Sequence, residues 1–224
     1  MKLTWITQAG LLLETNGLQV MIDPYLSDSV GKVEGKWRRI PVDEKLFDLC
    51  PDVMIFTHDH LDHYDPETAP RFLDKREKAM VVLSPHSCWQ KAVRHGAPHN
   101  YVRFEPGAEW TEKGVRFISV PAEHSDPCAI GVVIEAEEKR LYVTGDTLYS
   151  SYVLDSVPCD IDYVFLPVNG VGNNMNMCDA ARFAADAEAK CAVPLHYGLF
   201  DELDPADFCF ENKLILTPYE TVEI

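Results

Sequence analysis

The chemistry of this chain is concentrated in one short loop of alternating histidines and aspartates. The loop reads Thr57-His58-Asp59-His60-Leu61-Asp62-His63. A random order of the same residues would place such a cluster in roughly one chain in a thousand. Imidazole and carboxylate are donors that Zn, Mn or Fe accept, whereas Mg or Ca prefer oxygen alone. The loop therefore predicts a site for zinc, manganese or iron.

The loop has ligands to share between two metal ions. His58 and His60 are two residues apart in extended backbone, so their side chains project to the same side and can bind one ion. Asp62 and His63 follow where the loop turns toward a helix, and they can reach a second ion. Four ligands are too few for two metals that keep positions open. The remaining ligands are expected from three strand ends further along the chain, His124, Asp146 and His196.

The elements that must position this loop predict an α/β fold. Residues 3–26 alternate short strands with turns, which is typical of an antiparallel meander. The apolar run 52–57 is typical of a strand buried on both faces, and the histidine loop leaves its carboxyl end. A helix opened by Pro66, a strand over 80–85 and a helix over 87–95 follow in a βαβ rhythm.

The second half of the chain begins with strands and turns alone and then returns to strands that alternate with helices. Residues 101–147 alternate strands and turns, which predicts a second, antiparallel sheet. Strand-like runs and helices then alternate again, at 162–168, 177–189, 191–197, a short helix from Pro205, and 213–218. Two sheets, each flanked by helices, predict a four-layer αββα sandwich, formed as one domain over residues 1–224.

The ordered set of ligands resembles the metallo-β-lactamase superfamily, whose pattern is His-x-His-x-Asp-His, a lone His, an Asp after a strand and a final His. The resemblance extends from Asp23 to the final strands. It implies two groups of ligands that each bind one ion: His58, His60 and His124 for the first, and Asp62, His63 and His196 for the second. Asp146 would bridge the two ions.

A finer resemblance is to the L-ascorbate-6-phosphate lactonase-like branch of that superfamily. It is carried by Asn169-Gly170 after a strand, Asn174-Met175 before an Ala-rich helix, and Pro194-Leu195-His196-Tyr197 followed by Phe200. The branch often has Arg-Asp where this chain has Val171-Gly172, so a basic contact to a substrate phosphate is missing from the pattern. The resemblance implies a lactonase-like hydrolase and leaves its substrate open.

The predicted function is metal-dependent hydrolysis. A hydroxide bridged by two divalent metals, Zn or Mn with Fe also suitable, would attack the carbonyl of a lactone or small carboxylic ester. Asp62 and Asp146 are the predicted catalytic carboxylates, while Asp59 is expected to be solvated or to hold the loop. Two alternatives stay open. One is a phosphodiesterase on the same scaffold, and the other is a non-catalytic metal-binding protein.

Three further residues are candidates for supporting the site or touching substrate. The family resemblance places a supporting aspartate at Asp23, behind the metal loop. Asn169 either lies at the mouth of the site or forms an Asn-Gly turn. Tyr197 either reaches substrate or is an ordinary core aromatic. Residues 27–45, with Trp37-Arg38-Arg39, predict a long surface loop that would be a substrate lid, a solvated loop or an oligomer contact.

Composition limits the partners. The formal net charge of −16 repels phosphate backbones, so no nucleic-acid partner is expected. No apolar stretch has the length of a signal core or a membrane span, so no membrane partner is expected either. Seven scattered cysteines favour reduced thiols and a cytoplasmic location. We expect a small-molecule substrate, which two divalent ions would allow to be anionic. A homo-oligomer is expected from family habit alone.

Overall fold

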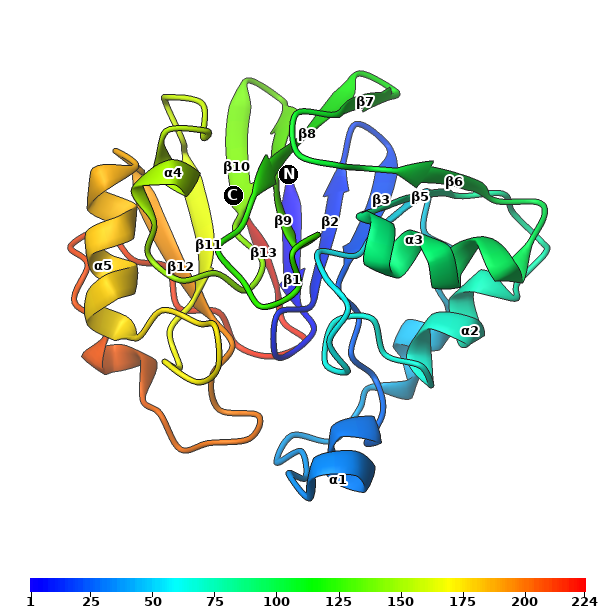
Figure 1. Cartoon of the computed structure of the whole chain (residues 1–224), viewed down its shortest axis with the longest axis horizontal. Coiled ribbons are helices and arrows are strands. Elements are labelled where there is room, and N and C mark those ends of the chain that lie inside the picture. Colours follow the sequence, from blue (N-terminus) through cyan, green and yellow to red (C-terminus); the bar gives the residue numbers. More distant parts are fainter.

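The chain folds into two β-sheets that face each other, with helices on both outer sides (Figure 1). The computed structural model describes residues 1–224. The first sheet has seven strands, in the order β13 (Thr221–Glu223), β1 (Lys2–Trp5), β2 (Leu11–Thr15), β3 (Leu18–Ile22), β4 (Val53–Ile55), β5 (Val81–Ser84) and β6 (Asn100–Arg103). The second sheet has six, in the order β12 (Cys191–Leu195), β11 (Tyr163–Pro167), β10 (Lys139–Val143), β9 (Ile130–Ala136), β8 (Val115–Pro121) and β7 (Glu109–Glu112).

Strand direction in the first sheet follows from the connections. β1, β2 and β3 form the predicted antiparallel meander. Asn16 and Gly17 make the tight turn between β2 and β3 with φ angles of 47° and 71°, as a two-residue hairpin requires. β4, β5 and β6 are parallel. They are parallel because helices α2 (Thr68–Leu73) and α3 (His86–Ala92) return the chain to the same end of the sheet.

The second sheet combines the same two kinds of connection. β7 to β10 are antiparallel, whereas β11 and β12 run parallel to β10. Helices α4 (Ser151–Leu154) and α5 (Met177–Asp186) lie in the crossovers. The side chain of Asn176 caps α5 by accepting hydrogen bonds from two backbone N–H groups of its first turn. Ala180 and Phe183 are buried on the inner face of α5, so the helix covers the second sheet.

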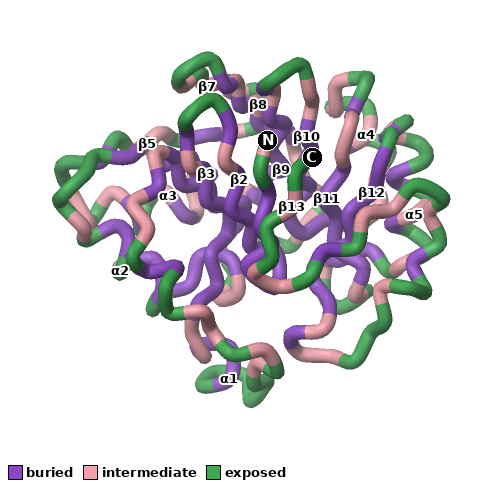
Figure 2. Tube along the Cα trace, turned by 180° about the vertical axis from the view of Figure 1, so that it is seen from behind, coloured by how far each residue is buried: buried purple, intermediate pink, exposed green.

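The apolar core has two layers. Alternate side chains along a strand point to opposite faces of the sheet and so belong to different layers. In β4, Val53 and Ile55 belong to the apolar cluster between the two sheets. Met54 points the other way, into the cluster with Phe72 of α2 and Cys88 of α3. Figure 2 shows the buried part of the trace running along the strands of both sheets, with the exposed part at the outer helices and turns. These layers confirm the αββα sandwich predicted from the sequence.

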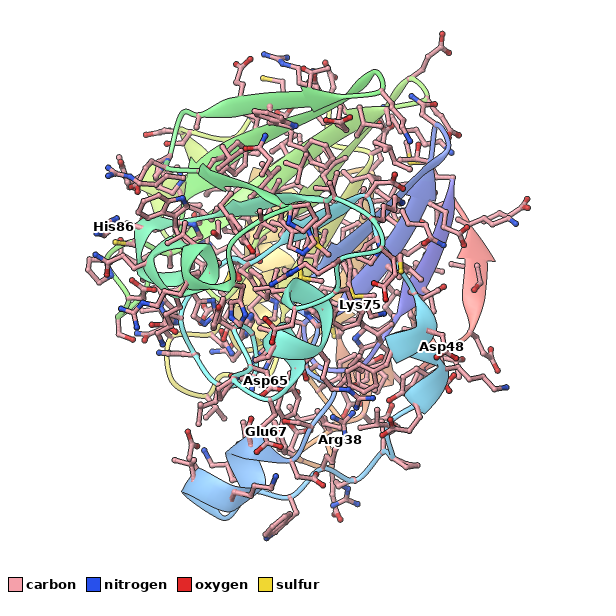
Figure 3. The ribbon with its side chains drawn as sticks, turned by 90° about the vertical axis from the view of Figure 1, so that its right-hand side faces the viewer. Arg38, Asp48, Asp65, Glu67, Lys75 and His86 are labelled. Atoms are coloured by element: carbon pink, nitrogen blue, oxygen red, sulfur yellow. The ribbon has the colours of Figure 1, made fainter.

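Residues 27–45 are only partly the structureless loop that the sequence predicts. They contain the short helix α1 (Ser29–Glu34), which projects beyond the edge of the sandwich (Figure 1), and the 3-10 helix η1 (Glu44–Asp48) begins within them. Arg38 holds the segment to the body, because its guanidinium donates hydrogen bonds to the carbonyl oxygens of Tyr25, Ser27 and Ile40. Figure 3 shows Arg38 where this segment meets the rest of the molecule.

Three element predictions were wrong in detail. The predicted strand at 101–105 belongs to β6, a parallel edge strand of the first sheet that ends at Arg103, because strand periodicity alone does not specify a pairing partner. The run 213–218 makes only an isolated bridge from Lys213 to Ala192, and the last strand is β13 beside β1. Pro66 lies before α2, which begins at Thr68, rather than in its first turn.

The remaining helical turns are short. They are the 3-10 segments η2 (Val93–His95), which continues α3, and η3 (Pro205–Asp207). The longest helix, α5, has ten residues, and no helix has the length and apolar character needed to cross a membrane.

Candidate metal centre

The predicted ligands converge at one edge of the sandwich, although they are far apart in sequence. The histidine loop follows β4 of the first sheet, and the other ligands follow β8, β10 and β12 of the second. Ligand sites in α/β folds form beyond the carboxyl ends of strands, where loops from several strands meet. In Figure 1 this is the lower edge, from which α1 projects.

The structure arranges all seven predicted ligands as two adjoining groups. In each group the potential ligand atoms lie within 4.8 Å of one another, and the groups are His58, His60, His124 and Asp146, and Asp62, His63 and His196. The Asp146 carboxylate lies between the groups. Its oxygens are 3.9 Å from His58 Nε2, 3.2 Å from His63 Nε2 and 3.2 Å from His196 Nε2. This is the position that a bridging carboxylate needs.

The first group presents unpartnered donor atoms. His58 Nε2 and His124 Nε2 are buried and have no hydrogen-bond partner. Thr57 Oγ1 donates to Asp23 Oδ2 at 2.5 Å, so it accepts from His58 Nδ1, which lies 3.1 Å away. That arrangement puts the proton of a neutral His58 on Nδ1 and leaves the Nε2 lone pair for a metal.

Burial keeps two histidines of the first group neutral. It lowers the pKa of His58 well below the ordinary value, and the neighbouring His63 adds to that shift. It also lowers the pKa of His124 to about 4. Neutral imidazole is the form that binds metal, so His58 is already in the binding form at neutral pH. His124 is also neutral, but its Nδ1 accepts from the Asp126 backbone N–H at 2.9 Å, which puts its proton on Nε2.

The second group is held together by charge. His63 Nδ1 donates to Asp23 Oδ2 at 2.9 Å, and His196 Nε2 lies 3.2 Å from Asp62 Oδ2. Burial opposes the charged histidines, but the carboxylates outweigh it. Asp146 and Asp23 raise the pKa of His63 well above its ordinary value, and Asp146 and Asp62 raise that of His196 to about 9. In the metal-free protein these protons occupy positions that a cation would take.

Unusual backbone brings the ligands this close. Asp23 and His196 have φ angles of 42° and 62°, in the left-handed region that non-glycine residues rarely adopt. Gly145, with φ of 62°, precedes Asp146. A Cβ at Gly145 would come within 2.8 Å of the Ile130 carbonyl oxygen and 3.0 Å of Thr57 Cβ. Only glycine therefore lets the Asp146 loop approach the strand end that carries the histidine loop.

The other candidates from the sequence lie in different surroundings. The Asp23 carboxylate is completely buried behind the histidine loop. The Asn169 carboxamide is 3.0 Å from His196 Nδ1 and faces the cleft above the ligands. Asp59 is paired with Lys91 at 2.6 Å, which holds the loop. Tyr197 lies in the core against Trp5, with ring centroids 4.9 Å apart, and it does not line the cleft.

Three residues at the site were not identified from the sequence. Thr57 links Asp23 to His58, and its place directly before the histidine loop was the available signal. The Asp126 carboxylate accepts from the backbone N–H of Asp59 and from Ser87 Oγ, so it joins the histidine loop to the loop that carries His124. Gln8 contacts Asp62 and His196 from the turn after β1, and no pattern around it indicates chemistry.

A cleft of about 500 Å³ opens above both groups. Its lining includes Val30 and Glu34 of α1, Lys36, Asn169, residues 171–174 and Phe200. The lysines of the cleft are both paired, Lys36 with Glu34 at 2.9 Å and Lys91 with Asp59. The cleft therefore offers carboxamides and apolar side chains to a ligand, without an unpaired lysine or arginine.

Comparison with known proteins agrees with this geometry. Residues 19–197 match the family described as the beta-lactamase superfamily domain. The chain is 29% identical to a UPF0173 metal-dependent hydrolase of Bacillus thuringiensis, over 96% of this chain and 93% of that protein. Its fold is similar to that of an isothiocyanate hydrolase from Delia radicum gut bacteria, with a TM-score of 0.79, 20% identity, and coverage of 100% of this chain and 99% of the other. It is also similar to a metallo hydrolase of Ignicoccus hospitalis, with a TM-score of 0.74, 20% identity, and coverage of 99% and 97%.

Proposed function

The chain belongs to the metallo-β-lactamase superfamily of metal-dependent hydrolases, within which we propose that it uses two divalent ions to open a lactone or a small carboxylic ester. The observation that carries the proposal is the pair of ligand groups that share Asp146. A single-metal site would leave one complete group without a purpose. The lactonase-like branch suggested by the residues around Asn169 supports the same class of substrate.

The donor set fits two ions of zinc, manganese or iron. His58, His60 and His124 would hold one ion, and Asp62, His63 and His196 the other, with Asp146 shared between them. The unpartnered atoms in the first group support this assignment, since buried polar atoms without hydrogen bonds are costly in the absence of a ligand. When bound, such ions supply Lewis acidity that lowers the pKa of water and polarises a carbonyl oxygen.

Protein side chains would handle protons and orientation. Asp62 is the carboxylate of the second group that faces the cleft, with 18% of its side chain exposed, so it can accept a proton from an attacking water. Asn169 and Asn174 line the cleft beside His196 and can donate hydrogen bonds to the polar end of a substrate. Asp23 and Thr57 hold His63 and His58 from behind.

The lining of the cleft supports a carbonyl substrate over a phosphodiester. A phosphodiester carries a permanent negative charge that an arginine or unpaired lysine would recognise. The two lysines of the cleft, Lys36 and Lys91, are paired with Glu34 and Asp59. Val171 and Phe200 add apolar surface, which suits the hydrocarbon part of a lactone or ester.

The test is a substrate panel on the zinc- and manganese-loaded protein. It contains simple five- and six-membered lactones, p-nitrophenyl acetate and bis(p-nitrophenyl) phosphate, and chelator-treated protein is the blank. We expect metal-dependent hydrolysis of a lactone or ester, with kcat/KM at least about tenfold above that for the phosphodiester, a difference of about 1.4 kcal/mol in barrier.

Two results would contradict the proposal in different ways. A higher kcat/KM for the phosphodiester would keep the two-metal centre and replace the substrate class. Binding of two metal equivalents without hydrolysis of any member of the panel would favour a metal-binding protein without this activity.

A further inference from the structure

The side chain of Gln8 lies between two ligands of the second group. Its Nε2 atom is 2.8 Å from Asp62 Oδ2, and it is 3.1 Å and 3.2 Å from the two ring nitrogens of His196. Gln8 is 3% exposed and lies at the wall of the cleft. A carboxamide buried against a carboxylate and an imidazole can restrict the orientation of both side chains. The sequence patterns gave Gln8 no role.

The backbone around Gln8 is built to hold it there. Thr7 and Gln8 have consecutive positive φ angles of 74° and 52°. Neither residue is glycine, and such conformations persist only where surrounding contacts impose them. The contacts are present. The Gln8 carbonyl oxygen accepts from Trp5 Nε1 at 2.9 Å and from the His196 backbone N–H at 3.0 Å, and Arg38 donates to Thr7 Oγ1 at 3.1 Å.

We propose that Gln8 is the positioning residue of the second ligand group: its amide N–H donates to Asp62 Oδ2, so that Asp62 and His196 are held in place to bind a divalent cation. The proposal rests on the two-metal centre of the proposed function and adds a residue outside the set of ligands. An ionised carboxylate only accepts hydrogen bonds. A donor on one oxygen therefore fixes its rotation and leaves the other oxygen for the metal.

The same turn couples the two halves of the fold. Gln8 follows β1 of the first sheet, whereas His196 follows β12 of the second. The backbone bond from His196 to the Gln8 carbonyl sets the distance between these strand ends, and the Gln8 side chain sets the orientation of the ligands. The second group is therefore assembled across the sandwich, and Gln8 is at the junction.

The test compares Gln8→Met and Gln8→Glu with the parent protein. Both replacements keep the length of the side chain, and both remove the N–H donor. Zinc affinity is measured for each of two equivalents by competition with a chromophoric chelator, and cobalt(II) absorption reports the geometry around the metal. We expect the second equivalent to bind about 10- to 100-fold more weakly in both variants, with a changed cobalt spectrum, while the first equivalent stays within about twofold.

Gln19→Met is the matched control, because Gln19 is a partly buried glutamine of β3 in the same sheet but does not line the metal cleft. Its two zinc affinities should equal those of the parent. Tight second-equivalent binding in either variant would overturn the proposal, since the second group would then not need the N–H donor at position 8. Equal loss of both equivalents together with lower unfolding temperature of the metal-free protein would also overturn it, in favour of a general structural role. If Gln8→Met does not fold, the Gln8→Glu result decides alone.

Failure of the proposed function gives a different pattern. Parent protein that binds fewer than two zinc equivalents removes the second centre and the role of Gln8 with it. Parent protein that binds two equivalents, with both Gln8 variants unchanged, overturns the inference about Gln8 and leaves the two-metal hydrolase standing.

Discussion

The two ligand groups are built from similar side chains but are prepared for a metal in opposite ways. The first group consists of histidines around Asp146 whose Nε2 atoms at His58 and His124 have no partner, and burial keeps these rings neutral. In the second group, carboxylates surround His63 and His196 and raise their pKa values. The metal-free protein therefore presents one group with neutral, unpartnered rings and one group with internal ion pairs.

This difference teaches that metal ions would face different competitors at the two groups. A cation entering the first group would meet neutral imidazoles at His58 and His124 beside the Asp146 carboxylate. A cation entering the second group must displace protons from His63 and His196. The contrast in histidine pKa arises because Asp23, Asp62 and Asp146 lie close to His63 and His196. The number of histidines in each group does not explain it.

Removing the shared carboxylate should weaken both groups. Asp146→Asn takes one negative charge from between both groups, so both zinc equivalents should weaken, and hydrolytic activity should fall by more than about 100-fold, the upper range for residues that only support a ligand. Metal content after dialysis and kcat/KM measure the two effects. Asp48→Asn is the control, because Asp48 is exposed on η1 and makes no ion pair. Activity that survives Asp146→Asn would contradict the shared centre.

Proton competition should separate the two equivalents. Because the pKa of His196 is raised to about 9 and that of His63 is raised as well, lowering the pH from 9 to 7 should weaken the second equivalent about tenfold per pH unit for each proton displaced. His58 and His124 are neutral throughout that range, so the first equivalent should change much less. Calorimetry in two buffers of different ionisation enthalpy counts the protons released. Equal proton release by both equivalents would show that the contrast between the groups is wrong.

A nearly isosteric change at Thr57 should act on the first group. Thr57→Val removes the acceptor for His58 Nδ1–H, so the ring loses its preferred orientation, and the first equivalent should weaken about tenfold while the second changes less. Zinc competition measures both affinities. Thr111→Val, on the exposed face of β7, is the control. A selective loss of the second equivalent would reverse the assignment.

The smallest expected effect is on the stability of the metal-free protein. The pKa of His196 in the folded protein lies above its value in the unfolded chain. Its contribution to the free energy of unfolding is therefore complete below pH 6.5 and is lost as pH rises toward 9. The loss is on the order of 3 kcal/mol, or roughly 5–10 °C in Tm. The lowered pKa of His124 has the opposite sign, and stability from it is lost as pH falls from 6.5 through 4. Melting curves of chelator-treated protein should thus peak near pH 6.5. A Tm that rises from pH 6.5 to 9 would contradict these ion pairs.

The order of elements could be predicted because each depends on local periodicity. β4 is a short apolar run, and α5 repeats its buried residues at helical spacing. The errors lie where pairing is decided at a distance. Residues 101–105 have the pattern of any strand, and only the free edge at β5 places them in the first sheet as β6. The chain end could not be assigned either, since β13 depends on the edge of β1.

The histidine loop, with its dense donors, was determined by sequence alone, because its ligands are neighbours in the chain and their residue types define the chemistry. His124, Asp146 and His196 were predictable only as an ordered set at strand ends. The tertiary structure decided how those candidate ligands divide into two groups, and it placed Gln8 and Thr57 in contact with them. These properties depend on distances between segments separated by many residues, and on burial, which no single segment specifies.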